Sequence, residues 1–163
     1  NDLNYAYSRI KHKREFDDEL DGFAFDEVIK KGSEEQIKSL KLPKNASQSL
    51  ELIKRFEKDS LKLDASEYES LVSMVNFDEK AYLEIAKLSI KKLDPDALIG
   101  IFKRLKNTQI EALRAYLFIL AEFALFDELK LEIGNDKKNF NDFKLVLLAR
   151  EKNIKIDLYN LIQ

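Results

Sequence analysis

The sequence contains no cysteine and only one histidine, which excludes several kinds of functional site. Without cysteine there is no disulfide framework, no thiolate nucleophile and no cysteine-ligated metal. A structural zinc site needs several Cys or His ligands, and His12 alone does not supply them. His12 lies between Lys11 and Lys13, which lower its basicity and repel a metal cation, so we interpret it as an ordinary surface residue. We therefore expect no metal, no cofactor and no catalytic triad.

Glycine and proline are also scarce, with four and two residues in a chain of 163. The glycines are isolated, so they do not form a phosphate-binding loop. Few turn-forming residues, together with many Lys, Glu, Leu, Ala and Ile, favour helices joined by short loops. Hydrophobic residues make up 45% and charged residues 36%, which is enough apolar material for a core under a highly charged surface. We predict an all-α fold.

Neither sign of charge is in large excess. The formal net charge of −2 and a pI of about 5.6 give no overall electrostatic reason to bind nucleic acid or an anionic membrane, so we expect no nucleic-acid partner. One short basic run contains Arg9, Lys11, Lys13 and Arg14. A solvated helix face is the favoured interpretation of such a run. The alternative is contact with an anionic lipid surface, if a membrane anchor precedes Asn1.

One acidic segment partly matches a calcium-binding loop. Asp17, Glu19 and Asp21 occupy the first, third and fifth positions of the pattern, and Gly22 occupies the sixth. The bidentate glutamate that the twelfth position requires is missing, because Val28 stands there. We interpret the match as a chance fragment, since short motif fragments arise often.

The most apolar stretch of the chain covers residues 108–126. It is too interrupted by charge to favour a membrane-spanning helix, because Glu111, Arg114 and Glu122 fall within it. At about 100° per residue these three charges share one arc of a helix, and the other faces need cover from neighbouring helices. We predict an interior helix over 108–126, with the other helices packed around it.

Phe118 falls inside the polar arc of this predicted helix, together with Arg114 and Glu122. In one interpretation a loop or an adjacent helix of the same chain covers the phenylalanine. In the other, Phe118, Arg114 and Glu122 form a contact site for another protein chain.

Helix-start signals divide the rest of the chain into short helices. Capping-box spacings occur at 33–36, 66–69 and 108–111, and Asp94-Pro95 places a capping residue before a proline. Pro43 lies in a connector, because proline disfavours helix in the residue before it. We predict an N-terminal helical arm over 1–43 and a helical body over 44–163. In the body we expect antiparallel helix pairs, stacked as a short solenoid around the central helix.

The segment from Ala86 to Pro95 resembles the end of the second helix of a tetratricopeptide repeat, in its small-residue spacing and its closing Asp-Pro. The resemblance covers about one repeat, and it implies superhelical packing of helices. Gly100 and Phe102 lie near the glycine and aromatic positions of the next helix, but not in register, and no second copy occurs at the required period.

These observations favour a non-catalytic protein–protein interaction or scaffold module. Abundant Lys, Ile, Asn and Phe without Trp is typical of AT-rich bacterial genomes and is similar to helical accessory proteins of envelope machines, such as flagellar-motor scaffolds. We expect one component of a larger bacterial assembly, with another protein as its partner. The alternatives are a small-ligand binder or enzyme that uses carboxylates and tyrosines within the bundle, and a membrane-tethered adaptor. The first residue is Asn1 rather than Met, which favours a processed or anchored protein and leaves periplasmic, membrane-tethered and cytoplasmic locations open.

Overall fold

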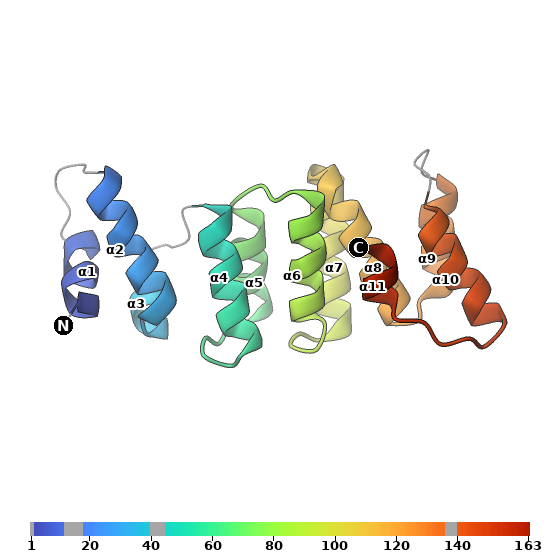
Figure 1. Cartoon of the computed structure of the whole chain (residues 1–163), viewed down its shortest axis with the longest axis horizontal. Helices are drawn as coiled ribbons and strands as arrows, with labels where there is room; N and C mark the ends of the chain where they lie inside the picture. The colour runs from blue at the N-terminus through green and yellow to red at the C-terminus, as the bar shows by residue number, and fades with distance from the viewer. Residues whose placement is uncertain (1, 12–17, 40–44, 136–139) are drawn as a thin grey trace. The chain divides into compact units, whose positions relative to one another are not determined.

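The computed structural model of the chain describes residues 2–11, 18–39, 45–135 and 140–163 (Figure 1). Every regular element in these ranges is helical, which confirms the all-α prediction. The chain divides into two compact units, Asn1–Asn76 and Phe77–Gln163. The boundary predicted after residue 43 lies outside the described residues and stays a prediction.

The first unit contains α1 (Asp2–Lys11), α2 (Asp18–Lys31), α3 (Glu34–Ser39), α4 (Ala46–Glu57) and α5 (Ala65–Ser73). α2 packs against α1, α3 and α4. Arg55 of α4 donates a hydrogen bond to the backbone oxygen of Ile29 in α2 at 3.0 Å. The buried side chain of Gln48 donates to the Asp26 carboxylate at 3.2 Å. These contacts hold α2, which the sequence placed in the arm, against α4, which it placed in the body.

The helix starts of this unit test two of the predicted capping boxes. Ser33 and Gln36 form the first as predicted: the Gln36 amide donates to the Ser33 hydroxyl at 3.2 Å, and the Ser33 amide donates to the Gln36 side chain at 2.9 Å. The box predicted at 66–69 is wrong, because Asp64 and Glu67 form it two residues earlier. Aspartate caps a helix about as well as serine, and these two residues have the same spacing, so the earlier pair begins α5.

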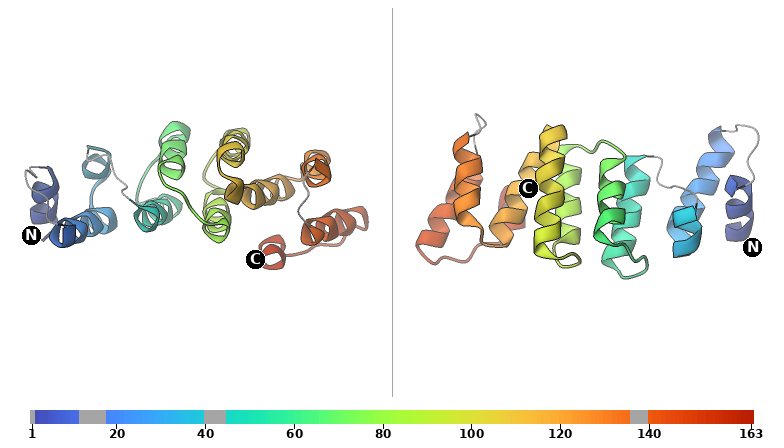
Figure 2. Two further views of the ribbon diagram at one scale, coloured as in Figure 1. Left: turned by 90° about the horizontal axis from the view of Figure 1, so that it is seen from above. Right: turned by 180° about the vertical axis from the view of Figure 1, so that it is seen from behind.

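The second unit contains α6 (Glu79–Ser89), α7 (Pro95–Thr108), the 3-10 helix η1 (Ile110–Ala112), α8 (Leu113–Glu122), α9 (Phe126–Asn135), α10 (Asn141–Glu151) and α11 (Leu158–Ile162). α8 packs against α6, α7, α9 and α11. Figure 2 shows α11 on the side of α8 that faces away from α7 and α9. The buried residues of α8 are Leu113, Ala115, Tyr116, Leu117, Phe118, Ile119, Leu120 and Ala121. The prediction of an interior helix in the most apolar stretch is therefore confirmed.

This interior helix is shorter than the predicted 108–126. Thr108 is the last residue of α7, and its hydroxyl donates to the Leu105 carbonyl at 3.2 Å, so the capping box predicted at 108–111 is wrong. Gln109 is extended, with φ −132° and ψ 102°, and separates α7 from η1. At the other end Ala124 adopts a left-handed φ of 57°, and a turn precedes α9. Residues 106–109 at the first break are all polar, whereas Phe123, Leu125 and Phe126 continue the apolar run across the second, so hydrophobicity alone does not predict the break between α8 and α9.

The start of α7 follows the prediction. The Asp94 carboxylate accepts a hydrogen bond from the Ala97 amide at 3.3 Å, and Pro95 is the first helical residue, where its missing amide hydrogen costs nothing. α6 is capped in the same way by Asp78, whose carboxylate accepts from Ala81 at 2.7 Å. The stacking of these helices as tetratricopeptide-like repeats stays a prediction.

Candidate functional site

The polar arc of α8 is covered by α11. Phe118 is only 2% exposed, and its ring meets the ring of Tyr159 edge to face, with centroids 5.9 Å apart and an interplanar angle of 70°. Leu158 and Ile162, four residues apart on α11, are 7% and 1% exposed. The interpretation in which an adjacent helix of the same chain covers Phe118 is confirmed. A contact between this face and another protein stays a prediction.

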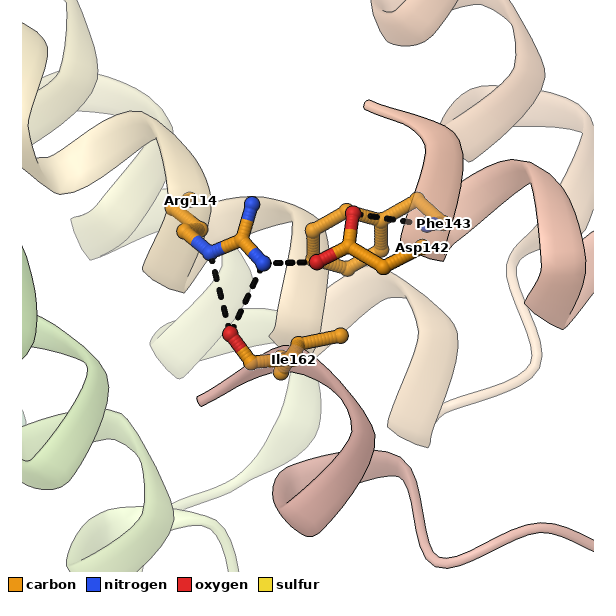
Figure 3. Close-up of polar contacts among 4 residues, drawn as sticks. All are labelled: Arg114, Asp142, Phe143 and Ile162. Atoms are coloured by element: carbon orange, nitrogen blue, oxygen red, sulfur yellow. Dashed lines mark hydrogen bonds and ion pairs between the residues drawn. The ribbon is translucent and has the colours of Figure 1, made fainter. Parts of the chain in front are cut away.

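Arg114 connects three helices of the second unit (Figure 3). Its Nε and one terminal nitrogen donate to the backbone oxygen of Ile162 at 3.2 and 2.7 Å, and the same terminal nitrogen pairs with the Asp142 carboxylate of α10. Its guanidinium carbon lies 5.2 Å from the centre of the Phe143 ring. The last carbonyls of a helix have no partner within the helix, so Arg114 satisfies an acceptor that α11 itself leaves open. Burial lowers the pKa of Arg114, which nonetheless stays charged at neutral pH.

α6 forms the other side of this site. The Lys87 ammonium lies 4.0 Å from the centre of the Tyr159 ring, a cation–π contact. Leu83 and Lys80 lie one and two turns earlier, respectively, on the same face of α6. A pocket of about 490 Å³ opens beside α11 and is lined by Glu79, Lys80, Leu83, Arg114, Tyr159, Ile162 and Gln163.

We call the surface that holds α11 the α11 groove. It comprises Lys80, Leu83 and Lys87 of α6 and Arg114 and Phe118 of α8. Phe118 contacts the ring of Tyr159, Lys87 lies over the same ring, and Arg114 donates to the Ile162 carbonyl. Lys80 and Leu83 line the pocket beside α11. Chemically, this surface is suited to binding a short helix.

Glu122 lies near the start of α11. Partial burial raises the pKa of the Glu122 carboxyl, the nearby Asp157 raises it further, and Lys91 lowers it. Asp157 caps α11, and its carboxylate accepts from the Asn160 amide at 3.3 Å and from the Asn160 side chain at 2.7 Å. Two carboxylates therefore repel each other where α11 begins. A second pocket, of about 480 Å³, adjoins this point and is lined by Ala121, Glu122, Phe126, Val146, Arg150, Asn153, Ile154, Lys155, Ile156 and Leu158.

The basic run near the N-terminus, the candidate for contact with an anionic surface, lies only partly within the described residues. Arg9 and Lys11 belong to α1, whereas His12, Lys13 and Arg14 lie outside the described residues. Contact of this basic run with an anionic surface therefore stays a prediction.

The calcium-like segment is largely helical. Residues 18–31 form α2, and Val28, at the position where a calcium loop needs its glutamate, is fully buried. A calcium loop does not wrap an ion while its residues are in a continuous helix, so the chance-fragment interpretation fits the structure.

Two buried tyrosines bear on the enzyme alternative. Burial raises the pKa of Tyr82, and it raises the pKa of Tyr116 to about 12, with contributions from Glu132 and Glu128. Both hydroxyls are therefore protonated at neutral pH.

Across the described ranges, no group of three or more His, Cys, Asp or Glu side chains is placed to hold a metal ion. None of the helices there combines the length and hydropathy needed to cross a membrane.

Comparison with known proteins gives no match: no family model, no curated protein and no solved structure is significantly similar to this chain. The tetratricopeptide resemblance is therefore neither supported nor opposed by a relative.

Sequence reasoning identified three residues of this site, Arg114, Phe118 and Glu122, and missed those that contact them. The i, i+4 spacing of Leu158 and Ile162 is a local signal that could have indicated an apolar face on a short helix. Nothing local in the sequence indicates which surface that face meets.

Proposed function

We propose that this chain is a non-catalytic protein–protein interaction module, one component of a larger bacterial assembly, and that it binds its partner through the α11 groove. The observation that carries the proposal is α11 itself, a short helix that the groove holds by apolar, cation–π and carbonyl-capping contacts. Amphipathic helices bound in apolar grooves are a recurrent mode of protein recognition.

The energetics of α11 support a surface built for helix binding. Isolated helices shorter than about 12 residues are marginal in water, so the five-residue α11 owes its helical structure to the groove. Burial of Leu158 and Ile162 contributes about 1.5–3 kcal/mol for each side chain. The groove thus supplies the free energy that orders a segment with little structure of its own, and a helix of another protein would benefit in the same way.

The proposal is tested by site-specific photo-crosslinking of the full chain in its source cells. The crosslinking residue is placed in turn at exposed positions of three helices, Lys80 of α6, Lys103 of α7 and Lys130 of α9. We expect a discrete adduct with another protein from Lys80, and weaker or no adducts from the other two positions. No adduct from any position, together with a monodisperse monomer in solution, would overturn the proposal.

A further inference from the structure

We infer that α11 is an internal substitute for the partner, and that the partner binds through a short amphipathic helix with the same chemistry. That helix has two aliphatic residues four positions apart, an aromatic residue directly after the first, and a terminal carbonyl that Arg114 caps. The inference rests on the proposed function and names the kind of segment that the groove accepts. In this view α11 competes with the partner for one surface.

The groove defines this chemistry through its contacts. Phe118 and Lys87 both contact the ring of Tyr159, so together they recognise an aromatic side chain at this position of the helix. Arg114 recognises the end of the helix, because two of its nitrogens donate to the same carbonyl oxygen, that of Ile162. A helix lacking the aromatic residue, or one that continues past the position of Ile162, would lose one of these contacts.

The chain is built so that α11 can leave without disturbing the body. α10 ends through its own hydrogen bonds, from the Asn153 amide to Arg150 and from the Ile154 amide to Ala149, with Asn153 at a left-handed φ of 56°. The connecting residues Ile154 and Ile156 are 56% and 40% exposed, so the connection itself is held by little burial. Release of α11 therefore leaves the end of α10 intact.

Two further features favour exchange of α11 for a partner helix. Glu122 and Asp157, two carboxylates that repel each other, lie near the start of α11, which weakens its attachment. When α11 leaves, Arg114 keeps its ion pair with Asp142, so the charged end of the groove stays in place. Phe118 then loses the ring that covers it, and the vacated surface is apolar beside a fixed cation.

The test uses the full chain and a labelled synthetic peptide of residues 153–163. The double variant Leu158→Ala with Ile162→Ala removes the two buried anchors of α11 and leaves every groove residue unchanged. We expect this variant to bind the peptide saturably and at least about tenfold more tightly than the unsubstituted chain, where α11 occupies the surface. The matched control is Leu161→Ala, a change at a residue of α11 that is 41% exposed, which should bind the peptide no better than the unsubstituted chain.

A folded double variant that does not bind the peptide more tightly than the control would overturn the inference. If the double variant does not fold, hydrogen exchange of the unsubstituted chain decides: α11 amides should exchange by local opening while α8 amides stay protected. If the amide hydrogens of α11 exchange only when those of α8 do, the inference is also overturned. An adduct from Lys80 without peptide binding overturns this inference alone. Peptide binding without any adduct, from a chain that is a monodisperse monomer in solution, overturns the proposed function.

Discussion

The ring of Tyr159 packs edge to face on the ring of Phe118, with centroids 5.9 Å apart, and so joins α11 to the interior helix of the second unit. Phe118 would otherwise be an apolar residue among the charges of α8. Its neighbours in the arc have related roles, since Arg114 holds the end of α11 and Glu122 lies near its start. α11 thus explains how Phe118, an apolar residue between the charged Arg114 and Glu122, is buried.

Phe118→Ser tests the burial of this ring. Because Phe118 is 2% exposed, the change removes a core aromatic side chain and introduces an unpaired hydroxyl, so the free energy of unfolding should fall by at least about 3 kcal/mol. Chemical denaturation provides the measurement. Leu161→Ala, at an exposed position on α11, is the control and should stay within about 0.5 kcal/mol of the parent. An equally small effect of Phe118→Ser would mean that the ring is not buried.

Arg114→Ala should lower the free energy of unfolding by about 1–3 kcal/mol, because it leaves the Ile162 carbonyl and the Asp142 carboxylate without their shared donor. Arg114→Lys should restore only part of this loss, since a single ammonium lacks the planar fork that serves two acceptors. Urea denaturation of both variants checks the result, with the exposed Lys103→Ala as the control. Full rescue by lysine would show that charge alone matters at this position.

Glu122→Gln should stabilise the second unit at neutral pH. The folded-state pKa of Glu122 is raised, so its ionised form opposes folding, and the parent loses stability as pH rises from about 4.5 through the folded-state pKa. The gain from glutamine should therefore be present above that range and absent below it. It should stay under about 1 kcal/mol, because the carboxylate is partly exposed and solvent screens it. Thermal unfolding of both chains between pH 4 and pH 8 measures the difference. A gain that is the same at every pH would contradict this account.

Asp64→Ala tests the capping box of the first unit. The change removes the acceptor for the Glu67 amide and should cost about 1 kcal/mol of stability. Ser66→Ala is the matched comparison, because the sequence alone points to Ser66 as the cap, whereas the structure places it inside α5. Denaturant midpoints of the two variants provide the measurement. A larger loss of stability from Ser66→Ala than from Asp64→Ala would indicate that Ser66, and not Asp64, caps α5.

Much of the helical layout follows from local sequence. Composition alone predicts the all-α fold, and the apolar stretch near residue 117 correctly marks the interior helix. The Ser33–Gln36 and Asp94-Pro95 signals succeed because each needs only residues within one turn. The 66–69 prediction fails because an equivalent acid pair stands two residues earlier, and local rules do not rank the two.

The rest of the site depends on contacts between residues far apart in the chain. Ala124 breaks the apolar stretch although its neighbours Phe123, Leu125 and Phe126 are apolar, so packing against neighbouring helices decides where α8 ends. Gln109, at the other break, follows a polar run over 106–108. Arg114 and Tyr159 are distant in sequence, and no local pattern predicts that α11 lies on α8. The arc of α8 could be identified from the sequence, but the segment that covers it could not.

The most direct test of this account is a nuclear Overhauser experiment on the full chain in solution. It should detect close contacts between the ring protons of Tyr159 and Phe118, because the ring centroids lie 5.9 Å apart. In the Leu158→Ala, Ile162→Ala variant these contacts should vanish, while contacts between α8 and α6 persist. Absence of the Tyr159–Phe118 contacts in the unsubstituted chain would contradict the claim that α11 occupies the groove.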